Sequence, residues 1–251
     1  MTTAWLEPHH GFGPAGITLT AKADGDGYVL DGVKWHVPYA QAADGFVVLA
    51  RGDAGVDLFT VDAKSDGIAI GQHQTIAADT QHAVTFDGVR VSAGSRIGAA
   101  GTGWDTWHAA MLDGIVLLAA QAVGGARFAL DMTVQYAKDR QQFDKPLGAF
   151  QAISHYLADA STTVEGATIL VHEAAWARAN DRPIDLLAPM AKLFACQTFR
   201  DVTAMGHQVH GGMGFTVECD MQMYFRRAKQ LQISWWNDRY LEELIAAQTL
   251  D

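Results

Sequence analysis

The stretch "YAKDRQQFDKPLGAFQ" (Tyr136–Gln151) decides how the second half of the chain folds. Apolar residues recur at three- and four-residue steps from Trp104 to Arg140, which is the period of a helix. Pro146 and Gly148 follow, and they end the pattern because proline cannot continue a helix. The sequence predicts a long helix with a charged C-terminal end. On structural grounds alone Arg140 suits the helix dipole there and needs no ligand.

The same period predicts three further helices in this half. The second runs from about Phe150 to Asn180, and the third begins after Pro183 and continues to about His210. The last is expected over Trp236–Gln248, after a strand-like piece that begins at Leu231. The long helices are apolar nearly all round, so we expect them to pack as an up-down four-helix bundle.

Residues before Gly101 follow a different pattern. Short segments rich in β-branched and aromatic residues lie between glycine or Asp-Gly turns, as in "GYVLDGVKWHV" (Gly27–Val37) and "GFVVLAR" (Gly45–Arg51). This pattern is typical of strands and predicts an antiparallel β-barrel or sandwich of roughly seven strands. The chain is therefore expected to be an α+β protein with a β-domain over residues 1–100 and a helical-bundle domain over residues 101–251.

The composition disfavours several classes of function. Of the 251 residues 49% are hydrophobic and 18% are charged, which indicates a packed globular protein. The net charge of -10 argues against binding to nucleic acid or to an anionic membrane surface. Cys196 and Cys219 make no disulfide framework and are expected to be buried thiols in a reducing cytoplasm. No secretion signal is evident, and the longest apolar run, Gly114–Ala126, is short for a membrane span. We therefore expect a cytoplasmic protein without membrane insertion.

The segment "HQVHGGMGF" (His207–Phe215) places two histidines one helical turn apart, before a run of glycines. Glycine at this point either caps the helix or lets the backbone approach a ligand closely. Spacing alone favours the cap and leaves the second possibility open. A metal site at His207 and His210 is not expected, because no third ligand is near in the sequence.

Taken together, these motifs resemble one family. "YAKDRQQFDKPLGAFQAISHYLAD" (Tyr136–Asp159), followed later by "QVHGGMGF" (Gln208–Phe215), is similar to the C-terminal helical domain of acyl-CoA dehydrogenases. "WLEPHHGFGPAGITLTA" (Trp5–Ala21) and "DGYVLDGVKWHV" (Asp26–Val37) resemble the family's middle β-domain. The resemblance covers essentially the whole sequence. The family's N-terminal helical domain has no counterpart in it, so we expect a fragment, a separate chain that supplies those helices, or oligomerisation.

The resemblance implies FAD as cofactor, held between the two domains and reaching a neighbouring subunit. Arg140 would meet its pyrophosphate, which suits a guanidinium. Other positions that match the family's cofactor contacts are Phe143, Gln151, Gln208, Gly211 and Gly212, together with His36 and Asn237. Around the flavin ring the match is poorer. The family's threonine that hydrogen-bonds the ring is Pro38 here, and proline has no donor to replace it.

The implied reaction is removal of an α-proton from an acyl-CoA thioester by a glutamate, with hydride transfer to the flavin. In most family members the glutamate stands where this chain has Trp235, and in others where it has Gly114. Both base positions are therefore empty. Asp113 is the nearest carboxylate, but one helical step turns it about 100° away from Gly114.

Four functions stay open on this basis. The first is a base-lacking acyl-CoA dehydrogenase-like chain in an oligomer with a base-bearing chain of the same family. The second is an active dehydrogenase that uses Asp113 or another carboxylate as its base and acts on an unusual acyl-CoA. The third is a flavin-dependent monooxygenase on the same fold. The fourth is a structural partner or remnant without catalysis, which the loss at Pro38 favours.

Overall fold

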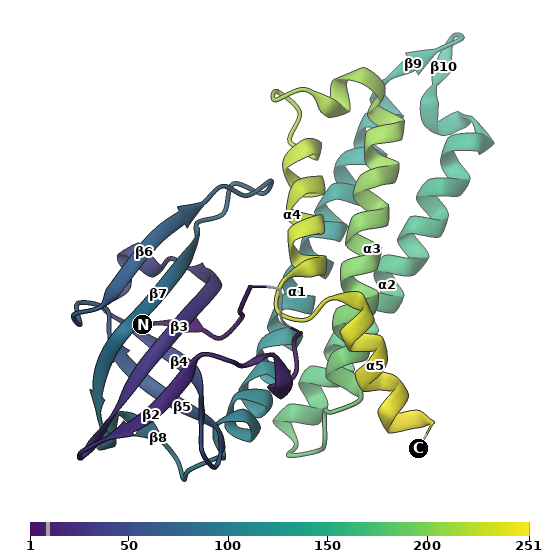
Figure 1. Cartoon of the computed structure of the whole chain (residues 1–251). Coiled ribbons are helices and arrows are strands. Elements are labelled where there is room, and N and C mark those ends of the chain that lie inside the picture. The colour runs from purple at the N-terminus through teal and green to yellow at the C-terminus, as the bar shows by residue number, and fades with distance from the viewer. Residues whose placement is uncertain (9–10, 251) are drawn as a thin grey trace. The chain divides into compact units, whose positions relative to one another are not determined.

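The computed structural model describes residues 1–8 and 11–250. The chain divides into two compact units, Met1–Ala110 and Met111–Asp251, which are described separately (Figure 1). The boundary lies ten residues beyond the predicted position, because the start of the first long helix packs on the β-strands. Trp107, on the first turns of that helix, lies with its ring centroid 5.7 Å from that of Trp5.

The first unit is built around one eight-stranded sheet, with strand order β6-β7-β3-β2-β4-β5-β8 and β1 beside β4. Its buried face is lined by alternate apolar residues such as Phe46, Val48 and Ala50, which is the two-residue period of a strand. The strands are β1 (Thr2–Ala4), β2 (Thr20–Asp24), β3 (Gly27–Pro38), β4 (Gly45–Gly52), β5 (Gly55–Asp62), β6 (Ile68–His73), β7 (Gln81–Ser92) and β8 (Arg96–Ile97). Short 3-10 helices are η1 (Pro14–Gly16), η2 (Ala40–Ala42) and η3 (Ala93–Ser95).

The sheet is mixed, which corrects the prediction of a purely antiparallel one. β1 pairs with β4 in parallel over three residues, and β2 meets β4 in parallel at Thr20 and Arg51. The remaining pairs between named strands of this sheet are antiparallel. Alternation along a strand shows which face is buried but carries no information about the direction of its neighbour, so the sequence could not show this.

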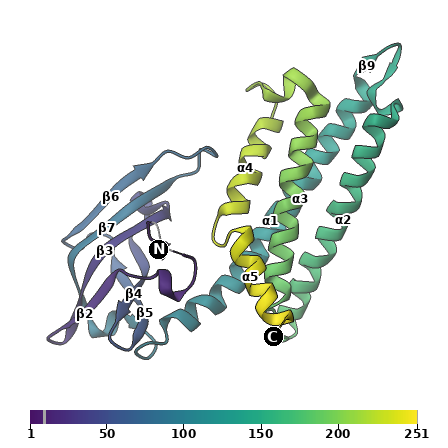
Figure 2. The same ribbon diagram turned by 45° about the vertical axis from the view of Figure 1, so that its right-hand side comes forward.

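The second unit consists of five helices, α1 (Gly103–Asp139), α2 (Gln151–Ala179), α3 (Leu187–His210), α4 (Met221–Ile233) and α5 (Asp238–Thr249), with α1 beginning in the first unit. A two-stranded hairpin, β9 (Gln141–Gln142) and β10 (Lys145–Pro146), and η4 (Leu147–Ala149) connect α1 to α2, and η5 (Gly211–Phe215) follows α3. In Figure 2 α1 to α4 run side by side and α5 lies at the end away from β9.

The strand-like interpretation of the residues from Leu231 is wrong, because they form the last turn of α4. Leu231, Ile233 and Trp235 alternate as in a strand, yet the buried residues of this element are Met221, Ala228, Leu231 and Gln232. Their spacing of three, four and seven residues is that of one helix face.

Small residues let the helices of the second unit approach one another. The buried face of α3 includes Ala188, Ala191 and Ala195, and α2 buries Ala160, Ala167 and Ala174. By length and composition α1 is also a candidate membrane span, although core helices of soluble proteins pass the same test. The absence of membrane insertion stays a prediction.

Candidate functional site

Six of the eight residues expected to contact a cofactor lie at one end of the helical unit: Arg140, Phe143, Gln151, Gln208, Gly211 and Gly212. The Tyr136 ring near the end of α1 stacks on the His210 ring at the end of α3, with centroids 4.3 Å apart. This contact places Arg140, just after α1, at the same end of the bundle as Gly211, just after α3. Figures 1 and 2 both show the β9–β10 hairpin and the turn after α3 at this end.

The hairpin between α1 and α2 has a strained turn. Phe143 and Asp144 both have left-handed backbone conformations, with φ of 53° and 63°. Two successive left-handed residues make the turn that suits a two-residue hairpin, but they usually include glycine. Phe143 is 85% exposed, with its ring edge-on to Phe150 at 6.2 Å, and Lys145 lies over the Phe150 ring. The hairpin therefore presents an aromatic surface to solvent at a cost in backbone strain.

The other predicted contacts at this end are exposed and unobstructed. Gln151 begins α2, and Gln208 lies on the last turn of α3 with its side chain outward. Gly211 has a φ of 61°, which favours glycine, and a Cβ built on Gly211 or Gly212 would meet no atom within 4 Å. Among the described residues the Arg140 guanidinium has no hydrogen-bond or ion-pair partner. A cation and bare backbone at an open surface fit an anionic group such as a pyrophosphate.

The two histidines of this end have packing roles. The Nδ1 atom of His210 lies 2.8 Å from the carbonyl oxygen of Gly206. The ring of His207 stacks on Phe215 at 4.5 Å and meets Phe225 edge-on at 4.9 Å. Burial lowers the pKa of His207, since the charged imidazole is disfavoured there.

The two positions at which the family carries its base lie against each other. A Cβ atom built on Gly114, on α1, would stand 2.1 Å from Cζ3 of the Trp235 indole. Trp235 lies in the turn between α4 and α5 and has a left-handed backbone with a φ of 66°. The indole thus fills the space that a side chain at 114 would need, and neither position offers an acidic group.

Asp113 is engaged elsewhere. Its two carboxylate oxygens accept hydrogen bonds from Nε and Nη2 of Arg178, on α2, at 2.6 and 3.0 Å. Both side chains are more than two-fifths exposed, so this is a surface ion pair. The structure thus gives Asp113 a bidentate partner and no support as a general base.

Asn237, predicted to bind the cofactor, is the N-cap of α5. Its Oδ1 atom accepts a hydrogen bond from the backbone N–H of Tyr240 at 3.0 Å. Asparagine is among the preferred residues at this position, because the first N–H groups of a helix lack partners within it. The capping role could have been predicted from the sequence, since Asn237 directly precedes a helical pattern, and its contact with the cofactor stays a prediction.

In the β-unit, His36 lies in a β-bulge of β3. The pairing of β3 with β7 shifts register between Lys34 and Val37, and His36 has a φ of 54°. Its Nδ1 atom is 2.7 Å from Oε1 of Gln81, and its exposed ring lies 5.7 Å from that of His73. Bulges re-aim side chains and occur often at active sites, so the strain marks this edge as a functional candidate.

The residues after His36 offer a flavin ring few donors. Pro38 lacks a backbone N–H, and its carbonyl oxygen accepts a hydrogen bond from the Thr2 hydroxyl at 2.6 Å. The N–H of the next residue, Tyr39, donates to the carbonyl of Thr80 at 3.1 Å. The β-unit therefore fits the ring half of FAD less well than the helical unit fits its pyrophosphate.

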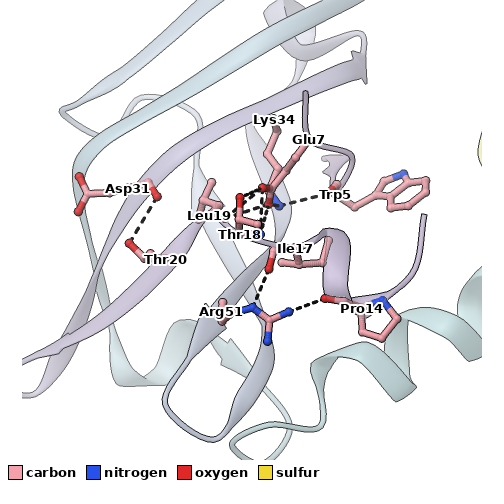
Figure 3. A network of polar contacts seen from close by, with 10 residues as sticks. All are labelled: Trp5, Glu7, Pro14, Ile17, Thr18, Leu19, Thr20, Asp31, Lys34 and Arg51. Atoms are coloured by element: carbon pink, nitrogen blue, oxygen red, sulfur yellow. Dashed lines mark hydrogen bonds and ion pairs between the residues drawn. The ribbon is translucent and has the colours of Figure 1, made fainter. Parts of the chain in front are cut away.

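A buried ion pair ties the segment before β2 to the sheet (Figure 3). The Lys34 ammonium, on β3, donates to Oε1 of Glu7 at 2.5 Å and to the carbonyl of Trp5 at 3.1 Å. Glu7 also accepts from the backbone N–H groups of Thr18 and Leu19 at 2.9 and 3.0 Å. Burial lowers the pKa of Lys34 to about 8, against the raising effect of the Glu7 carboxylate.

Sequence reasoning missed this pair and also Lys192, on α3. The side chains of Lys34 and Lys192 are both fully buried. A signal existed for each: Lys34 alternates with strand residues at an inward position, and Lys192 interrupts the apolar run "APMAKLFA" (Ala188–Ala195). Both cysteines are free, but only Cys196 is buried, while Cys219 is half-buried.

Comparison with known proteins agrees with this geometry. The model of the acyl-CoA dehydrogenase C-terminal domain matches residues 101–250, and that of the middle domain matches residues 2–89. The chain is 32% identical to the caffeyl-CoA reductase-Etf complex subunit CarC of Acetobacterium woodii, over 92% of this chain and 63% of that protein.

Two solved structures extend the comparison. An FAD-dependent dehydrogenase has a TM-score of 0.95 at 27% identity, covering 98% of this chain and 69% of that one. The ChsE4-ChsE5 complex of Mycobacterium tuberculosis has a TM-score of 0.88 at 29% identity, covering 99% and 66%. The chain thus spans about two-thirds of the length of these relatives, and it belongs to the acyl-CoA dehydrogenase family.

Proposed function

We propose that this chain is an FAD-binding subunit of an acyl-CoA dehydrogenase. The chain itself lacks the catalytic base and works with a second chain that carries it. The contact of the Trp235 indole with Gly114 carries the proposal. Abstraction of the α-proton needs a carboxylate within hydrogen-bond reach of the reacting carbon. The family's two positions for that group converge here on a glycine and an indole, neither of which can accept the proton.

The helical unit supports the FAD part of the proposal. FAD, when bound, supplies the hydride acceptor of the family's reaction. The unpaired guanidinium of Arg140 would hold its pyrophosphate with two parallel hydrogen bonds. Gly211 and Gly212 would let the backbone come close to the cofactor, and Phe143 and Gln151 would line the adenosine.

The names of two relatives support the partnership. CarC is a subunit of a complex, and ChsE4 and ChsE5 were solved as a complex of two chains. In such an arrangement this chain contributes cofactor contacts while the other contributes the carboxylate. A shared site of this kind would keep Arg140 and the glycines after α3 under selection and leave position 235 free to change.

The test is to purify the chain alone and after co-expression with a base-bearing acyl-CoA dehydrogenase-like chain from a neighbouring gene. Flavin content and bleaching of the flavin by acyl-CoA without oxygen are then measured. We expect no bleaching with the chain alone, and bleaching in the complex that depends on the partner's glutamate. Complete turnover by the chain alone would contradict the proposal.

Arg140 provides a sharper test within the complex. Arg140→Ala should weaken FAD binding roughly 10- to 100-fold, because hydrogen bonds to charged groups are lost. Arg239, on α5, pairs with Glu243 one turn away and serves as the matched control. Equal FAD affinity in the two variants would remove Arg140 from the site.

A second candidate function is a structural partner that binds no FAD of its own, which the missing donor at Pro38 favours. Calorimetric titration of the purified complex with FAD separates the two functions. FAD bound by the complex with an affinity that Arg140→Ala does not change would favour the structural partner.

A further inference from the structure

Lys192 is fully buried in the second turn of α3, where the Asp238 charge acts against the effect of burial on its pKa. Its ammonium donates hydrogen bonds to the carbonyl oxygens of Trp236 at 2.6 Å and of Gln232 at 3.3 Å. Among the described residues no carboxylate lies within ion-pair distance of it. Burial of an ammonium group is costly, and it lowers the pKa of Lys192. The hydrogen bonds to the two carbonyls offset part of this cost, so the role of Lys192 concerns the backbone that carries them.

The two carbonyls bracket the turn between α4 and α5. Gln232 lies on the last turn of α4, where carbonyl groups have no partner within the helix and carry partial negative charge. Trp236 follows the turn and is fully buried. Between them stands Trp235, whose φ of 66° is a strained conformation for a bulky residue. Such strain persists only where the surrounding structure fixes it.

We infer that Lys192 is a positioning residue, which bridges the two sides of this turn and thereby holds the Trp235 indole on Gly114. Asp238, whose charge also acts on Lys192, accepts hydrogen bonds at Oδ2 from the side-chain amides of Gln197 and Gln232 at 3.2 and 2.6 Å. Lys192 is thus the charged group that fixes the turn from α3. The inference concerns the site of the proposed function, but it depends only on packing within the isolated chain.

A methyl group added at Gly114, on α1, tests whether Lys192 fixes the Trp235 indole in place. Gly114→Ala forces the indole to move, and overpacking of this kind should lower Tm by roughly 2–10 °C. If Lys192 holds the indole, the same substitution in a Lys192→Met background should lower Tm by less than half as much, because the turn can then give way. An equal loss of Tm in both backgrounds would overturn the inference.

Gly125→Ala is the matched control. It lies on the same helix, and its added Cβ would stand 2.4 Å from Cζ of Phe199, a ring on α3. Its Tm loss should be the same with and without Lys192, because Phe199 does not belong to the turn. A general loosening of the unit by Lys192→Met would instead reduce both losses together, which also overturns the inference.

A second readout follows the indole itself. In chain labelled with 5-fluorotryptophan, the ¹⁹F resonance of Trp235 is assigned by Trp235→Phe. The chemical shift of the Trp235 resonance should change in Lys192→Met, while the chemical shift of Trp107, in the other unit, should not. Lys192→Gln keeps N–H donors without the charge and should retain the wild-type Trp235 resonance, which also serves if the methionine variant does not fold. An unchanged resonance in Lys192→Met, or equal shifts in both variants, would count against positioning.

Discussion

Lys34 in the β-unit and Lys192 in the helical unit are both fully buried, yet their charges are compensated in different ways. Lys34 meets the Glu7 carboxylate, which in turn collects backbone N–H groups. The Lys192 ammonium donates its hydrogen bonds to carbonyl oxygens at the end of α4 and beyond it. The first arrangement makes each ion depend on the other. The second uses one ion to fix a piece of backbone, and the carboxylate whose charge acts on it, Asp238, accepts its hydrogen bonds from glutamine side chains instead.

Loss of Lys34 should therefore have the largest effect. Lys34→Met leaves Glu7 as an uncompensated buried charge and should lower the free energy of unfolding by about 3–5 kcal/mol. Urea denaturation followed by circular dichroism measures this loss. The double variant Glu7→Gln/Lys34→Met should recover part of it, because the unpaired carboxylate is gone. No recovery in the double variant would mean that the loss comes from packing alone.

Acidification should break the Glu7–Lys34 ion pair without any substitution, because protonation removes the charge of Glu7. Burial raises the pKa of Glu7, but Lys34 and the hydrogen bonds from Thr18 and Leu19 outweigh it and lower the pKa overall. A carboxylate with a lowered pKa in the folded state contributes stability that is complete above its ordinary value of 4.5 and lost as the pH falls below it. The difference in unfolding free energy between wild type and Glu7→Gln should thus shrink below that pH. A constant difference would refute the assignment.

Lys192→Met should cost less than Lys34→Met. It leaves the carbonyls of Gln232 and Trp236 without their donor, which predicts a loss of about 1–3 kcal/mol in the free energy of unfolding. The same urea denaturation gives the value. A loss equal to that of Lys34→Met would remove the distinction between the two buried lysines.

The smallest expected effect is at the other side of the turn. Asn237→Ala removes the N-cap of α5 and should cost about 1 kcal/mol, whereas Asn237→Asp should be nearly neutral. Flavin content of the complex should not follow this substitution if Asn237 only caps the helix. A fall in FAD binding without loss of stability would support the prediction that Asn237 contacts the cofactor.

The sequence predicted the α+β fold and three long helices well, because periodicity is a local property. The end of α3 was also predictable, since glycines follow His210 directly. α1 ends at Asp139, seven residues before Pro146, because the β9–β10 hairpin lies between them. The sequence did not predict the parallel strand pairs or α4. The direction of strand pairing and the burial of a helix face both depend on contacts between residues distant in sequence. The alternating residues from Leu231 imitated a strand for this reason.

At the candidate site the sequence identified single residues but not which of them contact one another. Gly114 and Trp235 are far apart in the chain, and nothing in their spacing shows that one fills the space of the other. Likewise, the sequence identified Asp113 because it adjoins Gly114, but it could not show that Asp113 pairs with Arg178. Only the family resemblance connected Arg140 with the glycines after α3, and the stacking of Tyr136 on His210 shows that they share one end of the bundle.

The contact between Trp235 and Gly114 also constrains how this lineage can evolve. A mutation that returned glutamate to position 114 would meet the indole at once and be selected against as a folding defect. For a glutamate at 114 to fit, Trp235 has to be replaced first by a smaller residue. Return of the acid at position 114 therefore requires an ordered pair of changes, whereas a change of Trp235 to glutamate would clear the indole and supply a carboxylate in one step.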